Sequence, residues 1–189
     1  FLFIFGLVYL NNKHKWWIAI ICLLAILMAW GKNFLGFNTF LFNYLPLYNK
    51  FRVPTMTLFV PQLLFPLLGV MALQQFIFDE KDKTYAAQKL KLAGYIMLGV
   101  FAIAGMLYIS LDYKGENDAQ ITNAFNRMTQ GNTEAANSFY NALKQDRQSL
   151  FGDDLIRSLF FAAAAFLTLW LLVKNKLKPA YAMIALLLV

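Results

Sequence analysis

The sequence predicts an all-α integral membrane protein, in which a polytopic bundle of transmembrane helices carries a small external helical cap. Hydrophobic residues make up 60% of the 189 positions and charged residues only 14%, against roughly a quarter in ordinary soluble domains. Because lipid offers the backbone no hydrogen-bond partner, we expect long apolar runs to be helical. Six such runs occupy residues 1–10, 16–30, 54–78, 92–111, 155–173 and 179–189.

The apolar runs also divide the chain. The first and last runs are shorter than the roughly 20 helical residues that cross a bilayer, so we interpret the chain as an internal portion of a longer protein. Segment 1–111 is expected to hold transmembrane helices 1–4, with a re-entrant-like external loop at 31–53. Residues 112–154 are expected to form the external cap, and 155–189 to hold helices 5 and 6.

The lysine-rich connections predict the orientation of the chain. Loops 11–15, 79–91 and 174–178 are short, yet they contain nine of the 17 Lys and Arg residues and three of the ten acids. Positive residues concentrate in cytoplasmic loops. This places the three short loops in the cytoplasm and the long loops 31–53 and 112–154 outside. The net charge of +7 follows from this topology, so it requires no nucleic-acid partner.

The cap carries two helical patterns. Asn117 or Asp118 can begin the first helix, and Gly131 can end it. Asn132 or Thr133 can begin the second helix. The apolar positions at helical spacing are Ile121, Ala124, Phe125 and Met128 in the first helix, and Ala136, Phe139, Tyr140 and Leu143 in the second. We expect this helix pair to lie on the membrane surface.

The candidate binding segment lies in the stretch 31–69, which contains no acidic residue. Within it, residues 38–45 are expected to form a short helix in the membrane interface. The segment 48–52 then carries two cations, Lys50 and Arg52, between flanking prolines. Unpaired cations on the outer face indicate an anionic ligand, because Arg offers phosphate a bidentate fork and Lys a point charge. The alternative is that both side chains only snorkel to lipid phosphates at a helix start.

The helix that follows this segment is interrupted by proline. Pro61 and Pro66 each remove a backbone donor and are expected to kink the helix. Broken helices often line cavities in membrane proteins, although neighbouring helices can also accommodate a purely structural kink. Gln62 is expected to face protein rather than lipid, since a polar group at membrane depth needs a partner.

Other polar or reactive residues have simpler interpretations. Asp153, Asp154 and Arg157 stand at the expected start of the fifth helix, where they suit helix capping and an i,i+4 ion pair. His14 is expected to be solvated, and Cys22 to pack as a small apolar residue. A single His and a single Cys exclude a disulfide framework and a His/Cys metal cage. The sequence indicates no resident cofactor.

Residues 31–69 resemble the bacterial YfhO family of membrane proteins. The resemblance rests on Gly31-Lys32-Asn33, Asn38, Pro46, Tyr48-Asn49-Lys50-Phe51-Arg52-Val53-Pro54 and Pro61-Gln62, with Asp146-Arg147 and Asp154-Leu155-Ile156-Arg157-Ser158 further along. It implies a C-type glycosyltransferase of the bacterial cytoplasmic (inner) membrane, which takes a sugar from a polyprenyl-phosphate carrier on the outer face. The resemblance implies a role for Lys50 and Arg52 beside the donor phosphate. The candidate substrate-binding residues of this chain are Tyr48, Asn49, Lys50, Arg52 and Gln62.

The same resemblance limits what this chain can do alone. The catalytic carboxylate of such enzymes usually lies in a first external loop, which is expected to precede residue 1. No residue here is therefore assigned as catalytic, and the chain by itself is expected to be inactive. Two alternatives stay open: a transporter or flippase for a lipid-linked glycan, which would use broken helices and an external anion site equally well, and a non-enzymatic scaffold in envelope assembly. The sequence does not distinguish sugar, acceptor, metal dependence or oligomeric state.

Overall fold

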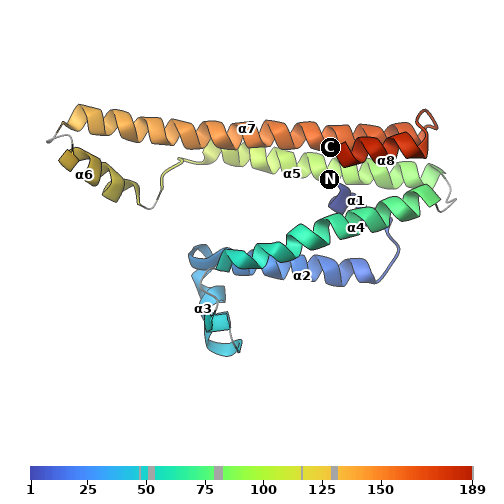
Figure 1. Ribbon diagram of the computed structural model, residues 1–189, viewed down its shortest axis with the longest axis horizontal. Helices are drawn as coiled ribbons and strands as arrows, with labels where there is room; N and C mark the ends of the chain where they lie inside the picture. The colour runs from blue at the N-terminus through green and yellow to red at the C-terminus, as the bar shows by residue number, and fades with distance from the viewer. Residues whose placement is uncertain (47, 51–53, 79–82, 116, 129–131, 189) are drawn as a thin grey trace. The chain divides into compact units, whose positions relative to one another are not determined.

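The computed structural model describes residues 1–46, 48–50, 54–78, 83–115, 117–128 and 132–188 (Figure 1). The α-helices are α1 (Leu2–Tyr9), α2 (His14–Ala29), α3 (Leu35–Tyr44), α4 (Phe59–Phe78), α5 (Lys83–Ser110), α6 (Asp118–Met128), α7 (Thr133–Val173) and α8 (Pro179–Leu188). Three short 3-10 helices are η1 (Gly31–Phe34), η2 (Tyr48–Lys50) and η3 (Pro54–Leu58). These described parts contain no strand, which confirms the all-α prediction for them.

Each of the six apolar runs contains a helix, but the helices differ in length. Thr55–Phe78, Lys83–Ser110 and Glu134–Val173 are long and apolar enough to cross a membrane. The helix of the second apolar run, α2, is shorter than these three. It has 16 residues, and His14 and Lys15 are the only residues before the apolar run that it includes. The structure therefore supports three spans by length and composition.

Residues 79–91, the second of the three lysine-rich segments, were expected to be a loop. Instead α5 begins at Lys83, nine residues before the apolar run begins at Leu92. Residues 83–91 contain no Pro or Gly, and Ala, Gln, Lys and Leu are good helix formers. The helix therefore covers most of the polar segment as well as the apolar run, and it ends at Ser110.

The cap and the fifth predicted span also differ from expectation. A second cap helix and a separate helix from 155 were predicted, but α7 runs without interruption over 41 residues. No proline lies in it, and Gly152 alone does not stop it. Asp153, Asp154 and Arg157 are consequently inside α7 rather than at a helix start. Among the described ion pairs none joins Asp153 to Arg157, so the predicted i,i+4 pair is wrong.

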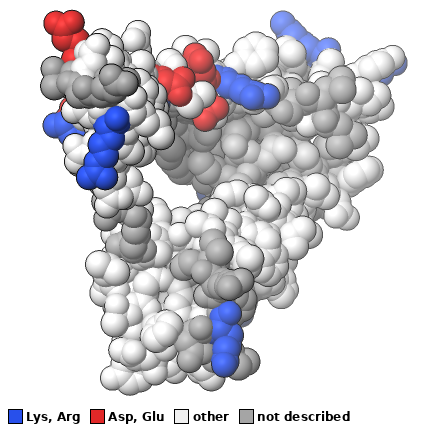
Figure 2. All heavy atoms as spheres, turned by 60° about the vertical axis from the view of Figure 1, so that its left-hand side comes forward, with Lys and Arg blue, Asp and Glu red and all other residues white. Residues whose placement is uncertain are grey.

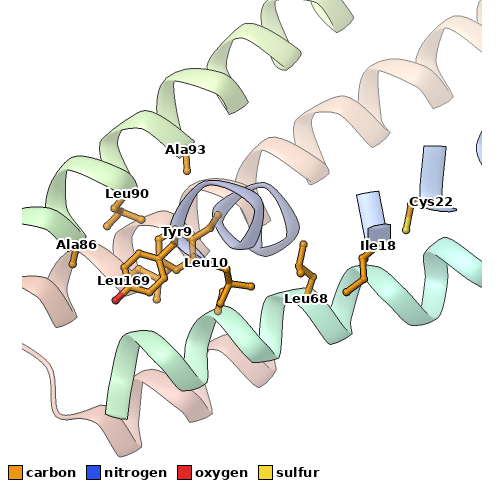
Figure 3. Close-up of a cluster of buried hydrophobic side chains, with 11 residues drawn as sticks. Tyr9, Leu10, Ile18, Cys22, Leu68, Ala86, Leu90, Ala93 and Leu169 are labelled. Carbon is orange, nitrogen blue, oxygen red and sulfur yellow. The ribbon is translucent and has the colours of Figure 1, made fainter. Parts of the chain in front are cut away.

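The chain forms two compact units, of which unit 1 comprises residues 1–96 and 165–189 and unit 2 comprises 97–164. In unit 1, the core surrounds α1, where Phe5 and Tyr9 are almost fully buried. Figure 3 shows side chains from several helices converging there. The buried cluster contains Phe5, Tyr9, Leu10, Ile18, Cys22, Leu68, Ala72, Ala86, Leu90, Ala93 and Leu169. The burial of Cys22 confirms its predicted role as a small packing residue.

Two glycines let α1 and α4 approach closely. A Cβ atom placed on Gly6 would lie 2.9 Å from the backbone oxygen of Leu68. A Cβ atom on Gly69, the next residue of α4, would lie 3.0 Å from Cβ of Leu2. Small residues at both points therefore set the spacing of this helix pair, as they do at many helix interfaces in membranes.

Lysine-rich connections lie beside aromatic side chains in unit 1. Lys83 Nζ donates a hydrogen bond of 2.7 Å to Asn175 Oδ1, so α5 is joined to the connection after α7. Lys91 and Lys174 both place their ammonium groups over Trp170, at 5.6 and 5.2 Å from the ring centre. These contacts hold two of the three lysine-rich connections together; their assignment to the cytoplasm stays a prediction.

His14 has a more specific environment than the sequence suggested. The indole Nε1 of Trp17 donates a 2.9 Å hydrogen bond to His14 Nδ1. Both residues lie on the first turns of α2, three positions apart, where helical side chains face one another. The residue expected to be merely solvated thus accepts a hydrogen bond at the exposed end of α2.

Candidate functional site

The candidate binding segment is organised by one asparagine of α3. Asn38 Nδ2 donates hydrogen bonds to the backbone oxygens of Gly31, at 3.0 Å, and Phe34, at 3.3 Å. Its Oδ1 accepts a hydrogen bond from the hydroxyl of Tyr48. Asn38 therefore ties Gly31, before α3, to Tyr48, after it, across the helix predicted at 38–45 and found as α3.

Tyr48 is placed to position its neighbours. Its side chain is only 7% exposed, and its hydroxyl is occupied by Asn38. Burial raises the pKa of the Tyr48 phenol above its ordinary value, so the hydroxyl stays a neutral donor. Of the predicted binding residues, Tyr48 is thus engaged inside the protein, and its ring anchors the turn η2.

Lys50 has the opposite character. It ends η2, and its side chain is exposed. Asn49 lies between the two residues in η2, whereas Arg52 lies outside the described residues. The turn therefore presents an ammonium group two residues after a buried, hydrogen-bonded tyrosine.

An apolar surface adjoins this turn. Along α3 and its C-terminal end the large exposed side chains are Leu35, Phe40, Phe42, Tyr44 and Leu45. No acid occurs anywhere in 31–69, and Figure 2 shows that charged side chains are sparse over this part of the surface. A surface that is apolar with cations at its borders suits a membrane interface.

Of the two prolines that were predicted to kink this helix, one lies at the start of α4 and the other in its interior. Pro61 lies in the first turn of α4, directly after η3, and it is buried. Pro66 is the proline inside the helix. Gln62 is exposed, so the prediction that it faces protein is wrong within this chain. Thr57 Oγ1 donates a 2.9 Å hydrogen bond to the oxygen of Ala25, which fastens η3 to α2.

A second polar centre lies in unit 2 and was not predicted. Asp118 is 6% exposed and accepts two hydrogen bonds from Arg147, of 2.7 Å from Nη1 and 2.6 Å from Nη2. The backbone N–H of Gly115 donates a third, of 2.7 Å. The Arg147 guanidinium, followed by the Gly115 N–H, lowers the pKa of Asp118 to about 2. Arg147 Nη1 also donates to the backbone oxygen of Tyr113 at 3.1 Å, which joins four residues in one node.

Asp112 forms a second ion-pair group nearby in the chain. Its two carboxylate oxygens contact Lys114 and Lys144 separately. Hydrogen bonds from these two lysines lower the pKa of Asp112 to about 2. Because this group is exposed to water, its contribution to stability is screened.

The cap helices meet through the apolar faces predicted for them. The rings of Phe125 in α6 and Phe139 in α7 stack with centres 4.4 Å apart. Asn132 Oδ1 accepts a 3.1 Å hydrogen bond from the N–H of Ala135, which confirms its predicted capping of the second helix. Asp118 begins α6, also as predicted, but its side chain is directed to Arg147.

The structure does not bring all the candidate residues into one site. Tyr48 and Lys50 share η2, while Gln62 lies in the first turn of α4. The described residues contain no group of three His, Cys, Asp or Glu side chains that could hold a metal ion. Comparison with protein-family models, with curated proteins and with solved structures finds no match to this chain. The resemblance to the YfhO family therefore stays a prediction.

Proposed function

We propose that this chain is part of a polytopic membrane glycosyltransferase, which uses a polyprenyl-phosphate-linked sugar on the outer face of the membrane. The observation that carries the proposal is the exposed Lys50 at the end of η2, held by the Asn38–Tyr48 hydrogen bond within the acid-free stretch 31–69. The apolar surface of α3 beside it suits a lipid substrate. Arg52, two residues further along, is assigned the second phosphate contact.

The chemistry explains why cations are required there. In the transfer, an acceptor oxygen attacks the anomeric carbon, and the bond from that carbon to the phosphate oxygen breaks. The acceptor proton passes to a base, which we do not place in this chain. Negative charge grows on the leaving phosphate, and fixed cations stabilise that charge most strongly in the transition state. Lys50 and Arg52 would act as phosphate ligands in this step.

The test measures sugar transfer from a radiolabelled polyprenyl-phosphate donor in membranes that contain the whole protein. Loss of a charge-assisted contact in a water-poor site costs about 2–4 kcal/mol, or roughly 30- to 1,000-fold in rate. We expect losses in this range for Arg52→Ala and smaller losses for Lys50→Ala. Arg52→Lys should recover only part of the rate, because an ammonium lacks the planar fork.

The matched control is Lys89→Ala, which removes a lysine from α5, in a connection predicted to face the cytoplasm. It should leave transfer within about twofold of the original rate, because Lys89 is a half-buried lysine that lies over the ring of Tyr85, in a connection predicted to be on the other side of the membrane from the chemistry. Expression and membrane insertion are checked for every variant. Full activity in a well-inserted Arg52→Ala protein would refute the phosphate contact and leave segment 48–52 as an interfacial anchor.

A further inference from the structure

Two lysines from different segments share one tryptophan ring in unit 1. Lys91 of α5 and Lys174, directly after α7, place their ammonium groups 5.6 and 5.2 Å from the ring centre of Trp170. In the other cation–ring contacts among the described residues, each ring has a single lysine. Two positive charges beside one ring repel each other, and an anion between them relieves that repulsion.

No acid offsets these two charges in the described part of unit 1. Its described ranges contain no Asp or Glu, and the side chains of Lys91 and Lys174 are both exposed. The three acids of the unit, at positions 79, 80 and 82, lie outside the described residues. The two connections 79–91 and 174–178 together contain seven lysines and these three acids, a net charge of +4. Positive charge therefore remains for an anion even if every acid is paired.

The ring that both lysines approach is held in place by its neighbours. Trp170 stacks on Phe166 with ring centres 6.0 Å apart, and both side chains pack against the buried cluster of unit 1. Gly94 of α5 faces Phe166, because a Cβ atom placed on Gly94 would lie 3.0 Å from that ring. This small residue lets α5 approach α7 beside the tryptophan. A ring that is already ordered loses little conformational entropy when a ligand binds.

The two lysines stand where polar sequence changes to apolar sequence. Lys91 comes directly before the apolar run 92–111, and Lys174 comes directly after the apolar run 155–173. These runs belong to two of the three helices that are long and apolar enough to cross a membrane. Lysine and tryptophan at the ends of such runs lie at the depth of the lipid headgroups. The anion that reaches this ring is therefore expected to belong to a lipid.

Exposed apolar side chains continue from both lysines along their helices. Tyr95, four residues after Lys91, is 69% exposed, and Leu171, three residues before Lys174, is 39% exposed. Positions three or four residues apart share one face of a helix. A ligand whose phosphate lies at the two lysines would thus meet apolar surface on the membrane side of that phosphate, as the acyl chains of a phospholipid do.

We propose that Lys91, Lys174 and Trp170 bind the headgroup phosphate of an anionic phospholipid. The two ammonium groups contact the phosphate, and the acyl chains follow the exposed apolar faces of α5 and α7. The lipid lies in the leaflet that the lysine-rich connections face, which is predicted to be the cytoplasmic one, where anionic lipids attract basic segments. The inference goes beyond the proposed function and does not depend on Lys50 or Arg52.

The experiment is native mass spectrometry of the 189-residue chain in dodecyl maltoside micelles. The chain is titrated with phosphatidylglycerol or with phosphatidylcholine of the same acyl chains, and the Kd of the first bound lipid is compared. We expect phosphatidylglycerol to bind more tightly. Lys91→Gln and Lys174→Gln should each weaken its binding about fivefold, the effect of one lysine near an anionic lipid surface. Binding of phosphatidylcholine, which has no net charge, should change much less.

The matched control is Lys176→Gln, which removes the same charge from the same connection as Lys174→Gln. Lys176 is exposed, and among the described cation–ring contacts none involves it. Its replacement should leave the Kd for phosphatidylglycerol within about twofold, as expected for a charge outside the site. Far-UV circular dichroism verifies that each variant keeps its helices. Equal losses in the Lys174 and Lys176 variants, or equal affinity for the two lipids, would overturn the proposal.

A soluble phosphate ester distinguishes a lipid ligand from a free one. Glycerol 3-phosphate carries a charged phosphate on glycerol but has no acyl chains to lie on the apolar faces of α5 and α7. We therefore expect that a large excess of it leaves phosphatidylglycerol bound. Displacement of the lipid by glycerol 3-phosphate would refute the assignment of a phospholipid to this ring.

Discussion

The close contact of α1 with α4 yields a quantitative prediction for Gly6→Ala. The added Cβ atom would lie 2.9 Å from the backbone oxygen of Leu68 and 3.0 Å from its Cγ. A backbone atom cannot rotate away, so the two helices must separate or the new side chain must strain. Overpacking of this kind typically costs about 1–3 kcal/mol.

A second effect of the substitution has the opposite sign. Alanine is favoured over glycine inside a helix by about 0.5–1 kcal/mol. Gly36→Ala in α3 isolates this second effect, because a Cβ atom there meets nothing within 4 Å. The Gly6 variant should therefore be less stable than the Gly36 variant by about 1–3 kcal/mol. Gly69→Ala should also be less stable than the Gly36 variant.

The assay is unfolding by dodecyl sulfate in mixed micelles, followed by tryptophan fluorescence. All four tryptophans of the chain, Trp16, Trp17, Trp30 and Trp170, lie in unit 1 together with the three glycines. The unfolding midpoint of each variant is compared with that of the unchanged chain. If the Gly6 variant were as stable as the Gly36 variant, the close approach of α1 and α4 would be refuted.

Three further predictions concern the cap and the topology. Because the pKa of Asp118 is lowered to about 2, its contribution to cap stability should be constant above about pH 4 and be lost as the pH falls from 4 to 2. The measurement is the hydrogen-exchange protection of α6, corrected for intrinsic exchange rates. In Asp118→Asn this loss of protection between pH 4 and 2 should be absent. Asn132→Ala should lower the free energy of opening of the first turn of α7 by about 1 kcal/mol, measured by exchange of its amides, since a capping acceptor is lost. In a Cys22→Ser background, an impermeant thiol reagent on intact cells should label Ser138→Cys but not Lys176→Cys, and the reverse pattern would invert the predicted topology.

The sequence predicted where helices occur more accurately than where they begin. Apolar runs mark the stretches that lipid can surround, and each of the six runs contains a helix in the described part of the chain. Helix boundaries follow different rules, namely propensity and capping. The polar residues 83–91 are good helix formers, and α5 therefore begins nine residues before its apolar part. For the same reason, the second cap helix and the following apolar span form the single helix α7.

In the candidate site, too, the sequence indicated some features and not others. Residue types and spacing identified Lys50 as a candidate ligand for an anion, and in the structure its side chain is exposed. The role of Asn38 required three-dimensional information, since its partners Gly31 and Tyr48 lie seven and ten residues away on opposite sides. Gln62 was misjudged because position along an apolar run does not determine which side of a helix faces a neighbour. In the first turn of α4 the side chain of Gln62 is exposed, whereas its neighbour Pro61 is buried.

The ion pair of Asp118 and Arg147 could have been predicted from the sequence of the two cap helices. The residues immediately around either one do not identify the other as its partner. The stacked Phe125 and Phe139 define the register of an antiparallel helix pair. Moving seven residues back from Phe125 reaches Asp118, and moving seven forward from Phe139 reaches Asp146, the neighbour of Arg147. Seven residues are about two helical turns, so these positions return to the facing sides of α6 and α7. The apolar register therefore places an acid opposite the Asp146–Arg147 pair, and the arginine, as the oppositely charged member, forms the contact.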